Sequence, residues 1–231
     1  MAAGDQPDLA RPFANATTAR RLADHRCPHC EIRRPLCFCH AIPQIWLQTR
    51  VIVVMHAAEE VLTTNTARLA AKALPNSEIR IRGRKERMST VGLIESGRNS
   101  LLLYPSPSAR ELTPDLVAGL SGRVTLIVPD GSWSQTRRTV RREPAFSGIP
   151  RIKLPPGPPS EYRLRAQPSD NSLCTLEAIA RAIGVLESRA VQERLETLLR
   201  VMVERTLWSR GMLSADRCTA GTIPHTAYAG G

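Results

Sequence analysis

The chain has 231 residues and a formal net charge of +11, with 32 lysines and arginines against 21 acidic residues. This length suits one sizeable domain with a small appendage. So large a positive charge is typical of proteins that bind a polyanion, either a nucleic acid or an anionic membrane surface. The longest apolar run, VIVVMHAA, is too short and too polar to cross a membrane. Because the N-terminus also lacks the apolar core of a signal peptide, we expect a cytoplasmic protein.

After a disordered tail at residues 1–18, a cysteine-rich segment is expected at residues 19–42. It contains four closely spaced cysteines, Cys27, Cys30, Cys37 and Cys39. Four thiolates in so short a segment match the tetrahedral demand of a structural zinc ion, and a filled set leaves no open position for catalysis. Clustered cysteines in a reducing compartment favour a metal over disulfides. Two alternatives remain: unrelated buried thiols, or replacement of one ligand by a neighbouring histidine, His25, His29 or His40.

Residues 43–212 alternate between apolar runs of strand length and longer helical patterns. Strands are predicted at 50–56, 100–106, 123–130 and 151–154. Helices are predicted at 59–74, directly after Trp133, at 172–187 and at 191–208. The runs are apolar on both faces, which indicates a mostly parallel sheet covered by helices, an α/β fold. Residues 213–231 are predicted to form a flexible tail.

Two strand ends carry the first candidate site residues, because open α/β sheets bind ligands beyond the carboxyl ends of their strands. The exit at 104–106 holds Tyr104, Pro105 and Ser106, and the exit at 129–133 has the sequence PDGSW. Asp130 is a candidate proton acceptor, and Gly131 allows the backbone to approach a ligand. The alternative is an ordinary Asp-Gly turn followed by Trp133 as a core residue.

Basic residues follow these exits. Four arginines fall at i, i+1, i+4 and i+5 on the helix after Trp133, namely Arg137, Arg138, Arg141 and Arg142. This stripe indicates a phosphate track more than a solvated face. Further on, Arg163 and Arg165 precede a helix whose first turn contains Thr175 and Glu177. Such residues usually cap a helix, although the free amides of a first turn can also face a ligand.

In this order, five segments resemble the DTW-domain family over roughly residues 24–205. They are the cysteine cluster, VIVVMHAAEEVLTTNTARLA, LLLYPS, VPDGSWSQTRR and YRLRAQPSDNSLCTLEAIA. The family's Asp-x-Thr-Trp motif stands here as Asp130, Gly131, Ser132 and Trp133. A second departure is Cys174, where the family favours serine in a Ser-Thr-Leu-Glu helix start.

The resemblance implies a SPOUT-like, knotted α/β fold that binds S-adenosylmethionine (SAM) at the sheet edge. Bacterial members of the family are tRNA-uridine aminocarboxypropyltransferases. They move the 3-amino-3-carboxypropyl group of SAM to N3 of a uridine and release methylthioadenosine. The implied partners are tRNA and SAM but no membrane, and the implied assembly is a monomer or a homodimer.

The resemblance also assigns roles. Asp130, Ser132 and Trp133 are the expected catalytic residues, with Asp130 as the base and Trp133 against the uracil or the adenine. The expected SAM-binding residues are Tyr104, Pro105, Ser106, Pro129, Leu173, Thr175 and Glu177. The expected RNA-binding residues are Arg137, Arg138, Arg141, Arg142, Arg163 and Arg165. Two alternative functions are a SPOUT-type RNA methyltransferase and a non-catalytic zinc-bearing RNA-binding module.

Overall fold

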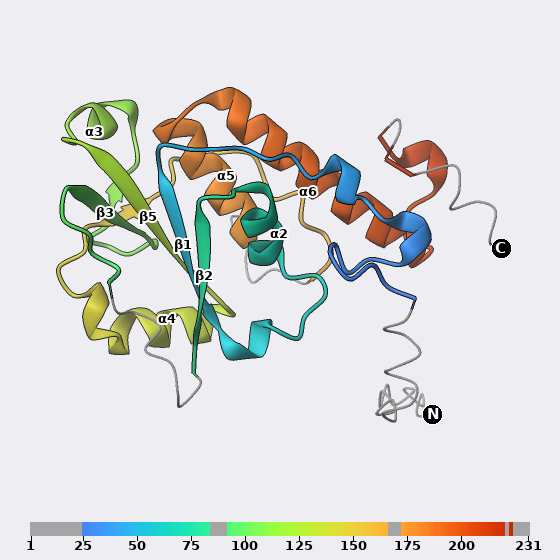
Figure 1. The fold of residues 1–231 in the computed structure, drawn as a ribbon, viewed down its shortest axis with the longest axis horizontal. Helices are drawn as coiled ribbons and strands as arrows, with labels where there is room; N and C mark the ends of the chain where they lie inside the picture. The colour runs from blue at the N-terminus through green and yellow to red at the C-terminus, as the bar shows by residue number, and fades with distance from the viewer. Residues whose placement is uncertain (1–24, 84–91, 166–171, 220–221, 224–231) are drawn as a thin grey trace, which may run out of the picture.

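The computed structural model describes residues 25–83, 92–165, 172–219 and 222–223. Its centre is a six-stranded sheet in the order β2-β1-β5-β3-β6-β4, in which every neighbouring pair is parallel (Figure 1). The strands are β1 Arg50–His56, β2 Ser77–Arg82, β3 Arg98–Leu103, β4 Arg110–Glu111, β5 Arg123–Asp130 and β6 Arg151–Lys153. The predicted mostly parallel α/β sheet is therefore confirmed.

Helices cover both faces of this sheet. They are α2 Thr66–Ala73, α3 Pro114–Ala118, α4 Trp133–Arg142, α5 Thr175–Leu186 and α6 Arg189–Ser209. Short 3-10 helices are η1 Arg34–Leu36, η2 Cys39–Ala41, η3 Ala57–Glu59, η4 Pro144–Phe146 and η5 Ala215–Arg217. Within the described ranges, none of the helices combines the length and the apolar character needed to cross a bilayer.

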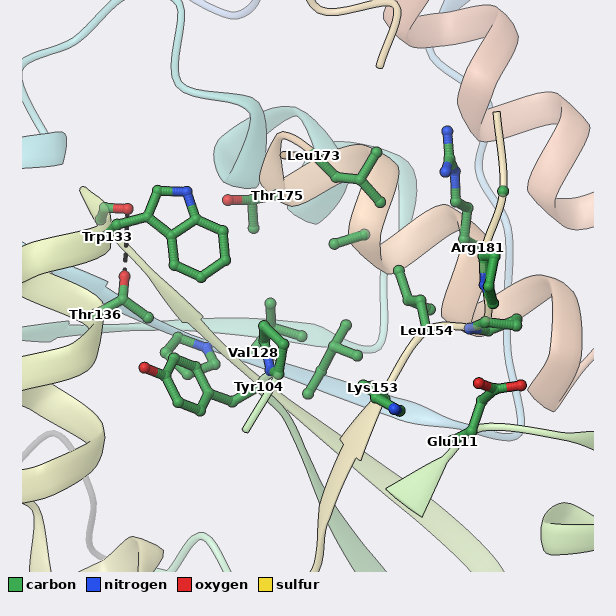
Figure 2. Close-up of a pocket in the computed structure, with 18 of the residues that line it drawn as sticks. Tyr104, Glu111, Val128, Trp133, Thr136, Lys153, Leu154, Leu173, Thr175 and Arg181 are labelled. Atoms are coloured by element: carbon green, nitrogen blue, oxygen red, sulfur yellow. Dashed lines mark hydrogen bonds between the residues drawn. The ribbon is translucent and has the colours of Figure 1, made fainter. Parts of the chain in front are cut away.

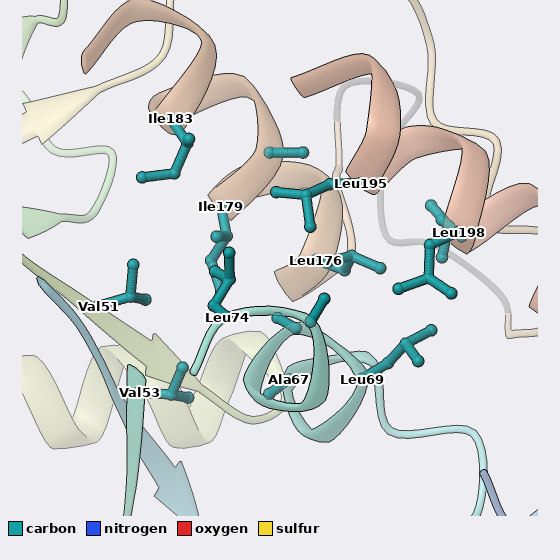
Figure 3. Close-up of a cluster of buried hydrophobic side chains, with 14 of the residues drawn as sticks. Val51, Val53, Ala67, Leu69, Leu74, Leu176, Ile179, Ile183, Leu195 and Leu198 are labelled. Carbon is teal, nitrogen blue, oxygen red and sulfur yellow. The ribbon is translucent and has the colours of Figure 1, made fainter. Parts of the chain in front are cut away.

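Alternate side chains of β1 enter two separate cores. Val51 and Val53 pack with α2 and α5, and α6 adds Leu195 and Leu198 to the same cluster (Figure 3). Ile52 and Val54 face the opposite side, where Val140 of α4 and Phe146 of η4 cover them. Successive side chains of a strand point to opposite faces, so a strand buried on both faces has the unbroken apolar run seen in the sequence.

Two local predictions in the first half of the sheet differ from the structure. The predicted helix at 59–74 begins only at Thr66, because the Asn65 side chain accepts a hydrogen bond from the Arg68 amide (3.0 Å) and caps α2 there. Strand β2 was not predicted, since its charged residues merged with the basic run that follows. Glu78 of β2 pairs across the sheet with Arg50 of β1 (2.8 Å), so the charges belong to an edge strand.

The C-terminal segment contacts α6 over part of the predicted flexible tail. The buried carboxylate of Glu204 accepts hydrogen bonds from the amide and the hydroxyl of Thr219, both at 2.8 Å. The carbonyl of Thr222, a buried residue, accepts one from Arg205. Thr219 and Thr222 of the predicted flexible tail thus contact α6, whereas the predicted disordered tail at 1–18 lies outside the described residues.

Candidate functional site

A pocket of about 470 Å³ opens at the carboxyl edge of the sheet, where β5, β3 and β6 end (Figure 2). Its walls come from the exits of β3 and β5, from the proline-rich loop 155–158 after β6, and from the first turns of α5. The parallel strands of an open sheet bring these four segments to one edge. The volume is in the range of small-molecule sites.

Most of the predicted SAM-binding residues line this pocket. They are Tyr104, Pro105, Pro129, Leu173 and Thr175, and Trp133 lines it as well. Two predicted residues lie outside it. The Ser106 hydroxyl is 3.3 Å from that of Ser108. The Glu177 carboxylate is buried and accepts hydrogen bonds from the Cys174 amide (2.9 Å) and the Ser160 hydroxyl (2.6 Å), so it caps α5, as the alternative interpretation had it.

Three charged residues at one end of the pocket were not predicted: Glu111 of β4, Lys153 of β6 and Arg181 of α5. The Nε atom of Arg181 is buried, and no described residue forms a hydrogen bond with it. A Cβ atom at Gly157 would lie 3.1 Å from Nη1 of Arg181, so a glycine in the loop leaves room for the guanidinium. Each of the three is a lone charge outside any motif, and β4 has only two residues, so the sequence carried no signal for this cluster.

Asp130 ends β5 and is only 8% exposed. One carboxylate oxygen accepts a hydrogen bond from the Thr175 hydroxyl, and the other accepts one from the Asn65 amide (3.1 Å). Thr175 begins α5 and Asn65 caps α2, so the positive ends of two helix dipoles lie near the carboxylate. Burial raises the pKa of Asp130, while both hydrogen bonds oppose the rise. Asp130 does not itself line the pocket, and it reaches it through the hydroxyl of Thr175.

A salt bridge lies on the Asn65 side of Asp130. Glu59, which is buried, pairs with Arg165 at 3.0 Å, and Arg165 also donates to the Thr64 hydroxyl at 3.3 Å. The Glu59 charge raises the pKa of Asp130 and the Arg165 charge lowers it, both less than burial does. Arg165, predicted to bind RNA, is therefore part of the electrostatic environment of the buried carboxylate.

Ser132, directly before the tryptophan, caps α4. The Gln135 amide donates to the Ser132 hydroxyl (3.3 Å), and the Ser132 amide donates to the Gln135 side chain (2.7 Å), which is a capping box. At Gly131, φ is 153° and a Cβ atom would lie 3.0 Å from the Gln135 Oε1 atom. Only glycine fits this turn without strain. Serine and threonine both cap helices, so the departure from the family motif keeps the local structure.

The basic stripe of α4 has the predicted exposure. Arg137, Arg138, Arg141 and Arg142 are all exposed, and among the described residues they form no ion pair. Thr136, Thr139 and Val140 form the buried face of the helix. Trp133 is 46% exposed at the start of α4, which excludes the alternative of a core residue.

The four cysteine sulfurs lie within 4.8 Å of one another, with Cys27 and Cys39 3.5 Å apart and Cys30 and Cys37 3.7 Å apart. With Zn–S bonds of about 2.3 Å, the edge of a zinc tetrahedron is about 3.8 Å, so the four residues fit this ion. Among the described residues, no histidine belongs to the cluster. Burial raises the pKa of Cys27, but the amides of Cys30 and His29 and the neighbouring thiols lower it to about 6 overall, whereas burial raises the pKa values of Cys30 and Cys39.

A buried arginine connects this cysteine segment to α6. Arg205 is 2% exposed, and its guanidinium donates to the carbonyls of Leu36 (2.9 Å), Cys37 (2.7 Å) and Thr222. Sequence patterns placed it on a core helix but gave it no role. The contacts make it the link between the cysteine segment, α6 and the C-terminal segment.

The family model described as the DTW domain matches residues 24–207. The tRNA-uridine aminocarboxypropyltransferase 2 of Macaca fascicularis is 29% identical over 180 residues, which are 75% of this chain and 60% of that protein. The Drosophila melanogaster protein of that name is 30% identical, over 76% of this chain and 71% of its own length. The tRNA-uridine aminocarboxypropyltransferase A of Arabidopsis thaliana is 27% identical, over 78% and 81%.

The chain therefore spans 60% of the macaque relative. A solved structure, the SAM-dependent rRNA:acp-transferase Tsr3 from Vulcanisaeta distributa, is 18% identical and superposes with a TM-score of 0.42. The superposition covers 71% of this chain and 81% of that one.

Proposed function

The chain belongs to the DTW-domain family, and on this premise we propose that it transfers the 3-amino-3-carboxypropyl group of SAM to N3 of a uridine in tRNA. The observation that carries the proposal is a 470 Å³ pocket whose wall includes Thr175, the hydrogen-bond donor to a buried carboxylate. The names of the curated relatives support the same reaction. Methylthioadenosine is then the second product.

The pocket has room for SAM along the sheet edge. It extends from β5 past β3 and β6 to β4, which is three strand spacings or about 14 Å. Leu103, Val128 and Leu154 provide an apolar wall for the adenosine, and Glu111 and Arg181 offer polar partners at the far end. The sulfonium and its reactive arm then lie near Thr175.

The chemistry needs removal of the proton on uracil N3. Because Asp130 lies behind Thr175, we propose that the threonine hydroxyl accepts this proton while it passes its own to Asp130. N3 then bonds to the γ carbon of the arm, the bond from that carbon to sulfur breaks, and its electron pair stays on sulfur. Geometry selects the arm over the methyl group, since only the carbon held in line with N3 reacts.

RNA contacts follow from the exposed residues around the pocket. We propose that Trp133, which is exposed and lines the pocket, stacks on the target base once that base has left its helix. The four arginines of α4, together with Arg163 and Arg165, are proposed to hold phosphates. The four cysteines would hold zinc as a structural ion, because their thiolates fill all four of its ligand positions. A SPOUT-like knot and a monomeric or homodimeric assembly are further proposals, supported by the family resemblance alone. A cytoplasmic location is proposed from the sequence.

The test is a single-turnover reaction of the purified protein with tRNA and SAM that carries one label in the methyl group and another in the arm. We expect the arm label in tRNA and the methyl label in released methylthioadenosine. Methyl label in tRNA would instead support the SPOUT-type methyltransferase. If neither label reaches any tRNA and SAM does not bind, the RNA-binding module becomes the better account.

Ser132 provides a smaller test, since it was predicted to be catalytic and the structure gives its hydroxyl a capping role. Ser132→Ala is expected to lower the free energy of unfolding by about 1 kcal/mol, because one orphan amide of α4 loses its acceptor. The transfer rate is expected to stay within a few-fold of wild type. Ser132→Thr should restore the stability, measured by urea unfolding. A large rate loss in a folded Ser132→Ala protein would show that the hydroxyl also contacts a reactant.

A further inference from the structure

A second cavity, of about 230 Å³, lies between the cysteine segment and the C-terminal end of α6. Arg26 and Arg33 of the cysteine segment, Thr63 and Thr64 before α2, and Arg210 after α6 all line it. These parts are far apart in the sequence, and Figure 1 shows the cysteine segment alongside the end of α6, away from α4. None of these residues belongs to the SAM pocket.

Three arginines line the second cavity, and the acidic residue in its lining, Glu31, already pairs with another arginine. The carboxylate of Glu31 forms a salt bridge with Arg68 at 2.6 Å, and the Glu31 carbonyl accepts from Arg26 at 2.8 Å. Arg33 and Arg210 are exposed, and among the described residues their guanidiniums have no hydrogen-bond or ion-pair partner. Two unpaired guanidiniums beside threonine hydroxyls match a phosphate group, which accepts several hydrogen bonds at once.

A short path of residues connects the second cavity to Asp130. Thr64 precedes Asn65, whose amide donates to Asp130, and Thr64 itself accepts hydrogen bonds from Arg165 and from the Tyr162 hydroxyl (3.0 Å). On its other side, Asp130 accepts from Thr175, which lines the SAM pocket. Asp130 thus links Thr175 of the SAM pocket to Asn65, which follows Thr64 of the second cavity.

We propose that this second cavity binds a backbone phosphate of the RNA substrate, through Arg33 and Arg210. The RNA then spans the molecule from the arginines of α4 to the cysteine segment, with its target uridine between them. The cysteine segment becomes part of the RNA-binding surface in addition to its structural role. The inference rests on the proposed function only in taking the substrate to be tRNA.

The test measures binding of a fluorescein-labelled tRNA transcript to the full-length, metal-containing protein by anisotropy, over a range of NaCl concentrations. The Arg33→Ala/Arg210→Ala double variant is expected to bind at least about tenfold more weakly, and the slope of log K against log salt is expected to fall by about 2, one for each lost phosphate contact. Binding of SAM by calorimetry, the metal content and the melting temperature should match wild type.

Arg194→Ala is the matched control, because Arg194 is exposed on the same helix, α6, 16 residues before Arg210, or about 24 Å along the axis. Its tRNA affinity should equal that of wild type. A double variant that binds tRNA like this control would overturn the inference. If the double variant loses tRNA affinity and the wild type transfers neither label, the proposed function fails and the phosphate site stands.

Discussion

Replacing Asp130 by asparagine is expected to slow single-turnover transfer by about 100- to 10,000-fold, the usual contribution of a positioned acid-base group. Asparagine has the size of the carboxylate but cannot take up the proton that leaves uracil N3. SAM affinity is expected to stay near that of wild type, because Asp130 does not line the pocket. Rapid quench of the labelled reaction and calorimetry measure the two effects separately.

The asparagine variant should also fold. The Thr175 hydroxyl can donate or accept, so the amide of the new side chain finds a partner there while its oxygen faces the Asn65 amide. Asp115→Asn is the matched control, since it removes an exposed carboxylate from α3. If Asp130→Asn transferred the arm at the wild-type rate, Asp130 would have no part in the proton transfer.

The stabilities of the wild type and of Asp130→Asn should also depend differently on pH. Because burial raises the pKa of Asp130, the folded protein binds this proton more tightly than the unfolded chain does. The favourable contribution of this proton to the free energy of unfolding is complete below the pKa that Asp130 has in the unfolded chain. It is lost as the pH rises through the pKa that Asp130 has in the folded protein. At neutral pH, Asp130→Asn should therefore be more stable than wild type, and the difference should shrink on acidification. The wild-type transfer rate should fall over the same interval, as the base becomes protonated.

The sequence predicted the strand exits better than the partners of the residues at those exits. Apolar runs and the Asp-Gly turn located Asp130 and Trp133, because strand ends and glycine turns are local signals. Asn65 is 65 residues away from Asp130 along the chain and sits in a segment predicted as the middle of a helix. Its contact depends on where α2 begins and on the fold that brings this point to the end of β5.

Helix capping explains why two of the predicted site residues, Ser132 and Glu177, lie outside the pocket. Ser132 and Glu177 both stand at the start of a helix, where a polar side chain satisfies amides that have no partner within the helix. A sequence pattern cannot separate this role from ligand binding, since both use the same amides and the same residue types. For Glu177 the deciding contacts include the Ser160 hydroxyl and the Glu161 amide, which tertiary structure alone brings together.

Arg205→Leu is expected to cause the largest loss of stability, about 3–5 kcal/mol in the free energy of unfolding, since each buried polar group left without a partner costs about 1–3 kcal/mol. Leucine leaves the carbonyls of Leu36, Cys37 and Thr222 without their donor. It also removes a positive charge beside Cys30 and Cys37, where zinc held by four thiolates would carry an excess of two negative charges. A zinc ion held by the four cysteines should therefore pass to a chelator faster than in wild type.

Arg200→Leu separates this effect from the loss of any arginine on α6. Its side chain is 40% exposed and pairs with Glu161 at 3.3 Å, so its removal should change the stability by less than about 1 kcal/mol. Urea unfolding of the two variants and metal release measured with a colorimetric chelator give the comparison. If Arg205→Leu unfolded and released metal like Arg200→Leu, the cysteine segment would hold its place without the buried guanidinium. If only Arg205→Leu is affected, the guanidinium of Arg205 holds the cysteine segment against α6. It then also holds Arg33 in place at the second cavity.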